Sequence, residues 1–216
     1  MATRRDKFRR GKMSGGRQPG LFDADESAPP RAARARRFVA PLPEGFRYQP
    51  DVISAEEERG LVRHIEMLPL REFEFQGYTG RRRVISFGWR YDFNNRRLEK
   101  VDEIPPLLLP LRDRAAAFAG LKADDLQHVL VTEYSPGAAI GWHRDRPAFV
   151  EIIGISLLSP CPFRLRRRKG NAWQRATVRL EPRSAYVLAG PARTEWEHSI
   201  PAVAELRYSI TFRTIL

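Results

Sequence analysis

The chain has 216 residues, a formal net charge of +12 and a single cysteine, Cys161. One cysteine excludes an intrachain disulfide and is typical of a reducing compartment, and no apolar run approaches the roughly 18 residues of a membrane span. The charged N-terminus lacks the apolar stretch of a secretory signal, so we expect a soluble, cytoplasmic protein without membrane contact.

Basic charge is concentrated at the N-terminus. Residues 1–37 hold eleven Lys or Arg and four acids, a net of +7 that leaves +5 for the other 179 residues. This segment is poor in apolar residues, so we expect a disordered tail, followed by one domain over residues 38–216. Within the tail, Gln18 to Phe22 resembles the Gln-x-x-Leu-Phe peptides that bind bacterial sliding clamps. The alternative is a chance apolar pair in a linker.

Two helices are predicted in the N-terminal part of the domain. Ser54 to Glu57 has the spacing of a capping box, and an apolar stripe from Leu61 to Leu68 stops before Pro69. A second, alanine-rich helix is predicted from about Leu107 to Leu121. We expect both helices to cover a sheet from outside.

The second half of the chain has the pattern of an antiparallel sheet protein. One strand begins near Gln127 and holds His128, which we interpret as structural. The later strands are rich in β-branched or aromatic residues and are separated by Pro, Gly or Asn. They are Val150–Leu158, Phe163–Arg168, Ala176–Leu180, Ala185–Leu188 and Leu206–Ile215. We therefore predict an α+β fold whose core, about residues 125–216, is a double-stranded β-helix (jelly roll) buttressed by the N-terminal helices.

His143, Asp145 and His198 are candidate metal ligands. Two imidazoles and one carboxylate leave three of six octahedral positions open, and this facial triad is diagnostic of non-haem iron oxygenases. On an extended segment, side chains two residues apart point to the same face, so His143 and Asp145 can reach one ion. A His-x-Asp triplet alone is more typical of a solvated polar turn.

The final strand carries a row of polar side chains at every second position. The row consists of Arg207, Ser209, Thr211 and Arg213. Such a row is ordinary on an amphipathic edge strand with its arginines in water. The functional alternative is that it faces the mouth of the barrel, where guanidinium groups bind carboxylates through two hydrogen bonds.

Three segments together resemble the AlkB family of Fe(II)- and 2-oxoglutarate-dependent dioxygenases. They are Val131 to Asp145, the Glu-His-Ser-Ile-Pro around His198, and the Arg-Tyr-Ser-Ile-Thr-Phe-Arg that ends at Arg213. The resemblance covers about residues 38–216 and implies that His143, Asp145 and His198 hold Fe(II).

The same resemblance implies a 2-oxoglutarate site. Arg207 would pair with the distal carboxylate of 2-oxoglutarate, Arg213 would lie beside the end that chelates the metal, and the Tyr134 hydroxyl would reach the co-substrate. Thr132 and Ser209 stand where many relatives have Asn, and both keep a short polar group. The implied reaction consumes O2, decarboxylates 2-oxoglutarate to succinate and hydroxylates a substrate carbon. A hydroxymethyl group on a ring nitrogen then leaves as formaldehyde.

Residues from about 70 to 95 resemble the nucleotide-recognition lid of the family. The candidate substrate-binding residues are Tyr78, Arg81, Arg82, Arg83, Trp89, Tyr91 and, after the metal ligands, Arg146. Tyr78 and the His143 ring would hold an extruded base between them, because enzymes that act on a base in a duplex extrude it and hold it between flat groups. The alternative is that the aromatic residues of this segment only pack against the core, as we expect for Phe87.

Two basic runs suggest contact with phosphate. They are Arg81 to Arg83 and Arg164 to Lys169, the latter on a predicted hairpin arm that leads into Gly170. Although charge runs are usually solvated, two runs near aromatic residues favour a nucleic-acid partner. We expect a monomer.

The substrate is left open by one departure from the family pattern. Relatives that demethylate adenine and cytosine often carry an acid two places after the metal aspartate, and here that residue is Pro147. The segment Arg83 to Tyr91 also resembles the lid of relatives that hydroxylate wobble uridines in tRNA. We therefore predict oxidative dealkylation of DNA or RNA bases. The alternatives are hydroxylation of a modified tRNA base or a protein side chain, and a non-catalytic nucleic-acid-binding module.

Overall fold

The computed structural model describes residues 41–75, 78–93 and 95–216. The predictions for residues 1–37, including the tail and the clamp-binding peptide Gln18 to Phe22, lie outside this part of the chain. Within the described ranges, no helix has the length and apolar character needed to span a bilayer.

The helices and strands follow one another in a simple order. They are β1 (Phe46–Gln49), α1 (Ala55–Glu66), β2 (Arg71–Phe75), β3 (Tyr78–Phe87), β4 (Trp89–Asp92), β5 (Arg97–Lys100), the 3₁₀ turn η1 (Pro106–Leu108), α2 (Leu109–Ala119), the 3₁₀ turn η2 (Ala123–Asp125), β6 (Leu126–Tyr134), β7 (Ile140–His143), β8 (Phe149–Leu157), β9 (Cys161–Lys169), β10 (Ala172–Leu180), β11 (Ala185–Leu188), α3 (Gly190–Thr194), β12 (Glu197–Ile200) and β13 (Arg207–Ile215).

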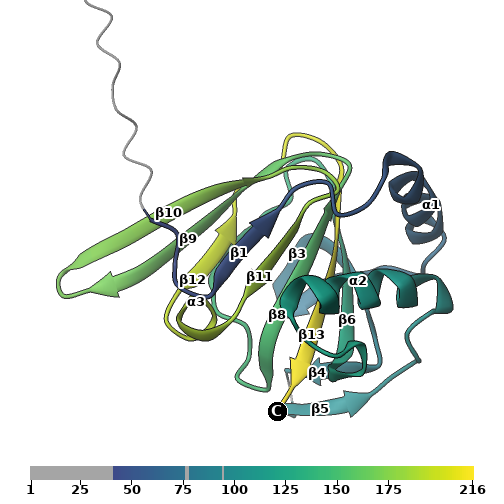
Figure 1. Ribbon diagram of the computed structural model, residues 1–216, viewed down its shortest axis with the longest axis horizontal. Helices are drawn as coiled ribbons and strands as arrows, with labels where there is room; N and C mark the ends of the chain where they lie inside the picture. Colours follow the sequence, from purple (N-terminus) through teal and green to yellow (C-terminus); the bar gives the residue numbers. More distant parts are fainter. Residues whose placement is uncertain (1–40, 76–77, 94) are drawn as a thin grey trace, which may run out of the picture. The chain divides into compact units, whose positions relative to one another are not determined.

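The described strands form two facing antiparallel sheets and a small ribbon (Figure 1). The larger sheet has the order β1-β11-β8-β13-β6-β3-β2, the smaller one has the order β10-β9-β12-β7, and β4 pairs with β5. Phe163 and Leu165 of β9 share an apolar cluster with Ile152 and Leu188 of the larger sheet, which fixes the two sheets face to face. The predicted jelly-roll core is confirmed.

The central strands of the seven-stranded sheet, β6, β8, β11 and β13, are mostly buried on both faces. The outer face of the sheet packs against Leu61 and Ile65 of α1 and Leu111 of α2, and α2 crosses this face in Figure 1. Phe87 belongs to the same cluster, so the prediction that it packs against the core is confirmed. The two predicted helices therefore cover the sheet from outside, as expected.

Strand β13 shows most clearly how the two faces differ. It lies between β8 and β6, and eight of its nine residues are buried. Tyr208, Ile210 and Phe212 belong to the core beneath the helices, whereas the alternate residues face the smaller sheet. An edge strand with its arginines in water, the first of the two interpretations of this sequence, is wrong.

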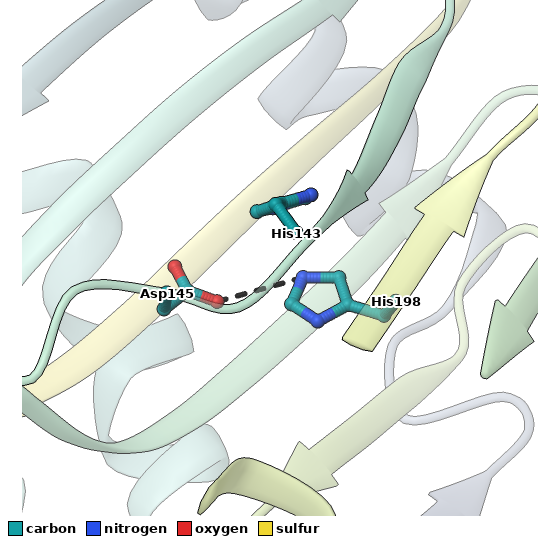
Figure 2. A group of neighbouring side chains, drawn as sticks. All are labelled: His143, Asp145 and His198. Atoms are coloured by element: carbon teal, nitrogen blue, oxygen red, sulfur yellow. Dashed lines mark ion pairs between the residues drawn. The ribbon is translucent and has the colours of Figure 1, made fainter. Parts of the chain in front are cut away.

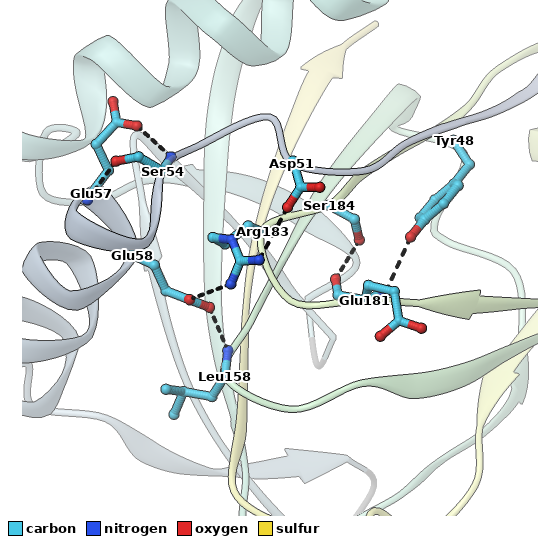
Figure 3. Close-up of polar contacts among 9 residues, drawn as sticks. All are labelled: Tyr48, Asp51, Ser54, Glu57, Glu58, Leu158, Glu181, Arg183 and Ser184. Carbon is cyan, nitrogen blue, oxygen red and sulfur yellow. Dashed lines mark hydrogen bonds and ion pairs between the residues drawn. The ribbon is translucent and has the colours of Figure 1, made fainter.

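Helix α1 is fixed to the jelly roll by a polar network (Figure 3). Ser54 accepts a hydrogen bond from the Glu57 backbone and Glu57 accepts one from the Ser54 backbone in return, which confirms the capping box. Glu58 accepts from the Leu158 backbone nitrogen at 2.8 Å and from Arg183 at 3.4 Å. Because Glu58 is buried, these two donors satisfy a carboxylate that would otherwise be costly.

The hairpin β9–β10 extends further than predicted. Strand β10 begins at Ala172, four residues before the expected start, and Gly170 makes the turn with φ +58°. Residues 172–175 were not predicted as part of the strand because they lack apolar alternation. This end of the hairpin projects beyond the core, so its side chains pack against those of the paired strand. The predicted placement of the Arg164 to Lys169 run on a hairpin arm is confirmed.

Candidate metal centre and co-substrate pocket

Three candidate metal ligands converge at the end of β7 (Figure 2). His143, the last residue of β7, lies directly opposite His198 of β12 in the antiparallel register, and Asp145 follows two residues later, beyond the strand. One ligand atom from each side chain lies within 4.8 Å of the others, and His198 Nε2 is 3.5 Å from Asp145 Oδ2. This separation allows all three to bind one ion, and the donor set is that of a facial triad.

The three side chains are in the protonation states that a metal requires. Burial lowers the pKa of His198 to about 3 and also lowers the pKa of His143. His143 Nδ1 lies 2.8 Å from the Gly141 carbonyl oxygen, an acceptor that fixes the proton on Nδ1 and leaves Nε2 as the ligand. Burial alone would raise the pKa of Asp145, but Arg213 and the two histidines lower it below its usual range. The carboxylate is therefore ionised.

Arg213 holds Asp145 in place from the facing sheet. Its Nη2 and Nε donate to Asp145 Oδ1 at 2.9 and 3.2 Å, and its Nη1 lies 3.3 Å from His128 Nδ1. Burial and the Arg213 charge hold the pKa of His128 well below its usual value, so the neutral ring can accept this hydrogen bond. Phe149 packs against both groups.

His128 is thus structural, as predicted, but no sequence motif indicated its contact with Arg213. The one signal was its place on β6, an even number of residues before Thr132 and Tyr134, which puts it on the same face of the strand.

The row of polar residues on β13 lines one cavity together with the metal triad. The polar lining consists of Arg207, Ser209, Thr211 and Arg213 from β13, Thr132 and Tyr134 from β6, Arg82 from β3, and His143, Asp145 and His198. The apolar wall is formed by Leu130, Ile140, Ile152, Phe163, Tyr186 and Ile200. Every predicted metal and co-substrate residue therefore faces this one cavity.

Arg207 offers an unsatisfied donor to this cavity. Only 1% of the residue is exposed, its Nε donates to Ser156 Oγ at 3.2 Å, and its guanidinium lies 4.9 Å from the centre of the Tyr134 ring. Among the described residues, no acceptor lies within hydrogen-bond reach of its buried Nη1. A buried N–H without a partner is costly, so this atom suits a carboxylate oxygen of an incoming dicarboxylic acid.

The three arginines of the Arg81 to Arg83 run have different surroundings. Arg82 faces the cavity opposite Tyr134, and its guanidinium lies 4.7 Å from the centre of the Phe73 ring. Arg83 points to the other face, where its Nη2 and Nε bind the buried Glu133 carboxylate at 2.6 and 2.8 Å. Arg81 is exposed. Of the three, Arg82 alone lines the cavity.

The loop after the metal ligands contacts the predicted lid segment. Arg146 lies over the rings of Tyr91 and Phe93, with 5.5 and 5.1 Å to the ring centres. Phe93 makes an edge contact with Phe73, and Phe73 in turn contacts Arg82. These contacts form a continuous series of rings and guanidinium groups that links the loop to Arg82. Trp89 is half-buried in β4. The side chain of Tyr78 lies outside the described part of the structure.

Arg193 in α3 is a further support that the sequence did not indicate. Its Nη2 donates to the carbonyl oxygens of Arg146 and Phe149 at 2.6 and 2.7 Å, and 7% of the residue is exposed. These bonds fix the loop that carries Asp145. No motif marks Arg193, because its acceptors are main-chain atoms more than forty residues away.

Comparison with known proteins agrees with this geometry. Residues 45–213 match the 2OG-Fe(II) oxygenase superfamily. The Alkylated DNA repair protein ALKBH8 homolog of Arabidopsis thaliana is 26% identical over 178 residues, which cover 70% of this chain and 49% of that protein. The tRNA (carboxymethyluridine(34)-5-O)-methyltransferase ALKBH8 of Macaca fascicularis is 30% identical over 168 residues, which cover 74% and 24%.

The chain therefore spans about half, or less, of the length of these two relatives. The solved structure of OsALKBH1 shares the fold, with a TM-score of 0.62 at 16% identity, over 80% of this chain and 98% of that one.

The fold and the donor set of the site agree with this match, and the chain belongs to the 2OG-Fe(II) oxygenase superfamily. This class implies Fe(II), 2-oxoglutarate and O2 as cofactor and co-substrates. Within the superfamily the chain is a member of the AlkB family, as the sequence resemblance predicted.

The buried histidines make the stability of the metal-free protein depend on pH. Because the pKa of His198 is about 3 in the folded protein and about 6.5 when unfolded, the unfolded chain binds more protons between these values. Stability is therefore fully present above about pH 6.5 and is lost as the pH falls. We expect His198 alone to reduce the free energy of unfolding by about 1.4 kcal/mol between pH 7.5 and 5.5.

Urea unfolding of the chelator-treated protein at these two pH values measures this loss. A His198→Asn variant should show a smaller difference between the two pH values than the wild type does. Equal pH dependence in both proteins would contradict the assignment of His198 as a neutral, buried side chain.

Proposed function

We propose that this chain is an active Fe(II)- and 2-oxoglutarate-dependent dioxygenase that oxidises a carbon attached to a base of DNA or RNA. One observation carries the proposal: the neutral His143 and His198, the ionised Asp145 and Arg207 all line one cavity, and Arg207 has a buried Nη1 without a partner. Metal-ligating side chains and a buried, unpaired guanidinium group around one cavity form the kind of cluster that is typical of a functional site.

The roles of the individual residues follow from their positions. His143, Asp145 and His198 hold Fe(II), and Arg207 binds the distal carboxylate of 2-oxoglutarate through a charge-assisted pair. Arg213 orients Asp145 and would lie beside the chelating end of a bound co-substrate. The further contacts to 2-oxoglutarate come from Tyr134, Thr132 and Ser209.

Iron, 2-oxoglutarate and O2 would supply the oxidation when bound: 2-oxoglutarate would lose CO2 and take up one atom of O2 to become succinate, and the other atom would pass to the substrate. The protein's own contribution is position and exclusion of water. Phe163 and Ile152 contribute buried apolar surface to the cavity wall. Arg213 holds the Asp145 carboxylate, and Arg193 holds the loop that follows it.

Residues on β3, β4 and the loop after β7 form the nucleotide-recognition lid in this proposal. Arg146, the residue after Asp145, lies over the Tyr91 ring, and Arg82 contributes a positive charge to the cavity lining. A flat ring beside a guanidinium group suits a base and its phosphate. The net charge of +12 favours the same class of substrate.

Two reactions are candidates, and each has support. Dealkylation of a damaged base fits the name of the Arabidopsis relative. Hydroxylation of a modified tRNA base is supported by the substrate in the name of the Macaca fascicularis relative, which is a modified uridine of tRNA. Pro147, which cannot receive an exocyclic amine as an acid would, favours a substrate other than simple N-methylated adenine or cytosine.

A panel of modified DNA and RNA oligonucleotides separates the two reactions. The iron-loaded protein is given O2 and 2-oxoglutarate, and succinate, formaldehyde and product mass are measured for each oligonucleotide. Dealkylation releases formaldehyde, whereas hydroxylation of a stable side chain adds one oxygen atom without release. The His143→Ala variant and unmodified oligonucleotides are the controls. If no oligonucleotide raises succinate formation above its unstimulated level, a nucleic-acid substrate is excluded.

A further inference from the structure

The outer face of the four-stranded sheet carries a row of arginines that the proposed pocket does not use. On β9, Phe163 and Leu165 point into the molecule, so Arg164, Arg166 and Arg168 point outward. The residues directly opposite them on β10 share this face, and so do Glu197 and Ser199 of β12.

Two tryptophans lie between these arginines. Arg166 lies over Trp142 and Trp173, with 4.4 and 4.2 Å to the ring centres. Arg164 lies 5.1 Å from the Trp142 ring and Arg168 lies 5.3 Å from the Trp173 ring. We call these five side chains the arginine–tryptophan ladder. Stacking on an indole restricts a guanidinium group before any ligand arrives, so less conformational entropy is lost when it binds an anion.

The face that carries the ladder has a large excess of positive charge. Its described strands hold five arginines, Arg164, Arg166 and Arg168 on β9 with Arg175 and Arg179 on β10, against one acid, Glu197. Glu197 pairs with Arg166 at 2.6 Å, and Arg179 pairs with Glu181 just beyond the end of β10. Within the described ranges, no acid pairs with Arg164, Arg168 or Arg175, and all three keep N–H groups for a ligand.

The ladder begins directly behind the candidate metal centre. Trp142 precedes His143, and Glu197 and Ser199 flank His198, so the strands that aim metal ligands inward aim the ladder outward. From there the ladder follows the β9–β10 hairpin, which projects from the body of the domain (Figure 1). Because β7 is an edge strand, a chain that leaves the cavity can pass around this edge and reach the ladder.

We propose that this face binds the sugar-phosphate backbone of the nucleic acid whose target nucleotide enters the pocket. Guanidinium edges bind phosphates through paired hydrogen bonds, and half-exposed indoles and guanidinium planes also accept stacked bases. An acidic protein would match the charge but not the flat groups. The inference rests on the proposed nucleic-acid substrate, but binding can be measured without iron and therefore independently of catalysis.

The test compares two double variants of the full-length, metal-free protein. Arg168→Glu/Arg175→Glu reverses two exposed charges on the hairpin, and the matched control Arg59→Glu/Arg63→Glu makes the same charge change on exposed positions of α1. The dissociation constant for a fluorescein-labelled single-stranded oligonucleotide is measured at several salt concentrations. We expect the hairpin variant to bind at least about tenfold more weakly, with a salt slope reduced by about 0.7 for each phosphate that it no longer binds.

The dissociation constant of the control variant should stay within about twofold of the wild-type value, because salt screens the long-range electrostatic effect of its changed charges. A Trp173→Leu variant should also weaken binding, and Trp173→Phe should retain more of it, because a ring still supports Arg166. Unstimulated succinate formation by the iron-loaded variants shows that the pocket is intact.

Equal binding by the hairpin variant and the control would overturn the inference. So would loss of poly-glutamate binding without loss of oligonucleotide binding, which would assign the face to an acidic protein. If the hairpin variant weakens binding but no oligonucleotide is oxidised, nucleic-acid binding by this face stands and the proposed function fails. If an oligonucleotide is oxidised but the hairpin variant binds it as tightly as the wild type does, the proposed function stands and the inference fails.

Discussion

A His198→Ala variant is expected to lose tight Fe(II) binding and, with it, all succinate formation that depends on 2-oxoglutarate. His198 is a buried, neutral ligand opposite His143, and alanine leaves the ion with two protein ligands. Removal of a residue that only supports a ligand typically lowers metal affinity by about 10- to 100-fold, so removal of a direct ligand should exceed about 100-fold. Anaerobic calorimetric titration with Fe(II) or Mn(II) measures this change.

The matched control is His64→Ala, which removes a histidine of α1 that does not line the cavity. It should bind Fe(II) as tightly as the wild type. If His198→Ala still binds the metal tightly, the ion is held at another site and His198 is not a ligand.

An Arg207→Gln variant is expected to bind 2-oxoglutarate far more weakly while it still binds Fe(II). Truncating one partner of a buried, hydrogen-bonded charge pair costs about 2 to 5 kcal/mol, which corresponds to roughly 30- to 5000-fold in the dissociation constant. Glutamine keeps a donor for Ser156 but carries no charge. The dissociation constant for 2-oxoglutarate is measured anaerobically on the Mn(II)-loaded protein.

Arg207→Lys distinguishes charge from geometry. Lysine keeps the positive charge but cannot offer two parallel N–H groups, so its effect should lie between those of glutamine and the wild type. If both variants bind 2-oxoglutarate as the wild type does, Arg207 does not contact the co-substrate. Unchanged Fe(II) affinity in both variants separates this result from a collapse of the metal centre.

Much of the fold could be predicted because alternation along a strand reports which faces are buried. The period-two row from Arg207 to Arg213 was visible in the sequence, as were the spacing of His143 and Asp145 and the capping box at Ser54. What alternation cannot decide is whether the polar face of a strand meets water or a second sheet. The structure decides this for β13 by placing it between β8 and β6.

Contacts between distant residues could not be predicted because they depend on strand register. Arg83 has the sequence context of a phosphate ligand, but β3 and β6 align it with Glu133, fifty residues away. His128 meets Arg213 for the same reason. The pairing of Trp142 with Arg164 and Arg166 requires β7 and β9 to flank β12, which neither the basic run nor the tryptophan indicated.

The candidate site draws its parts from both sheets. His143 and His198 belong to the four-stranded sheet and Arg207 and Arg213 to the seven-stranded sheet, with the contact between Asp145 and Arg213 as the present bridge. A metal ion and a dicarboxylate bound here would connect the two sheets and stabilise only the folded state in which the sheets pack together. Iron limitation is then expected to shorten the lifetime of the protein, because without these ligands the two sheets separate more often and expose the chain to proteases.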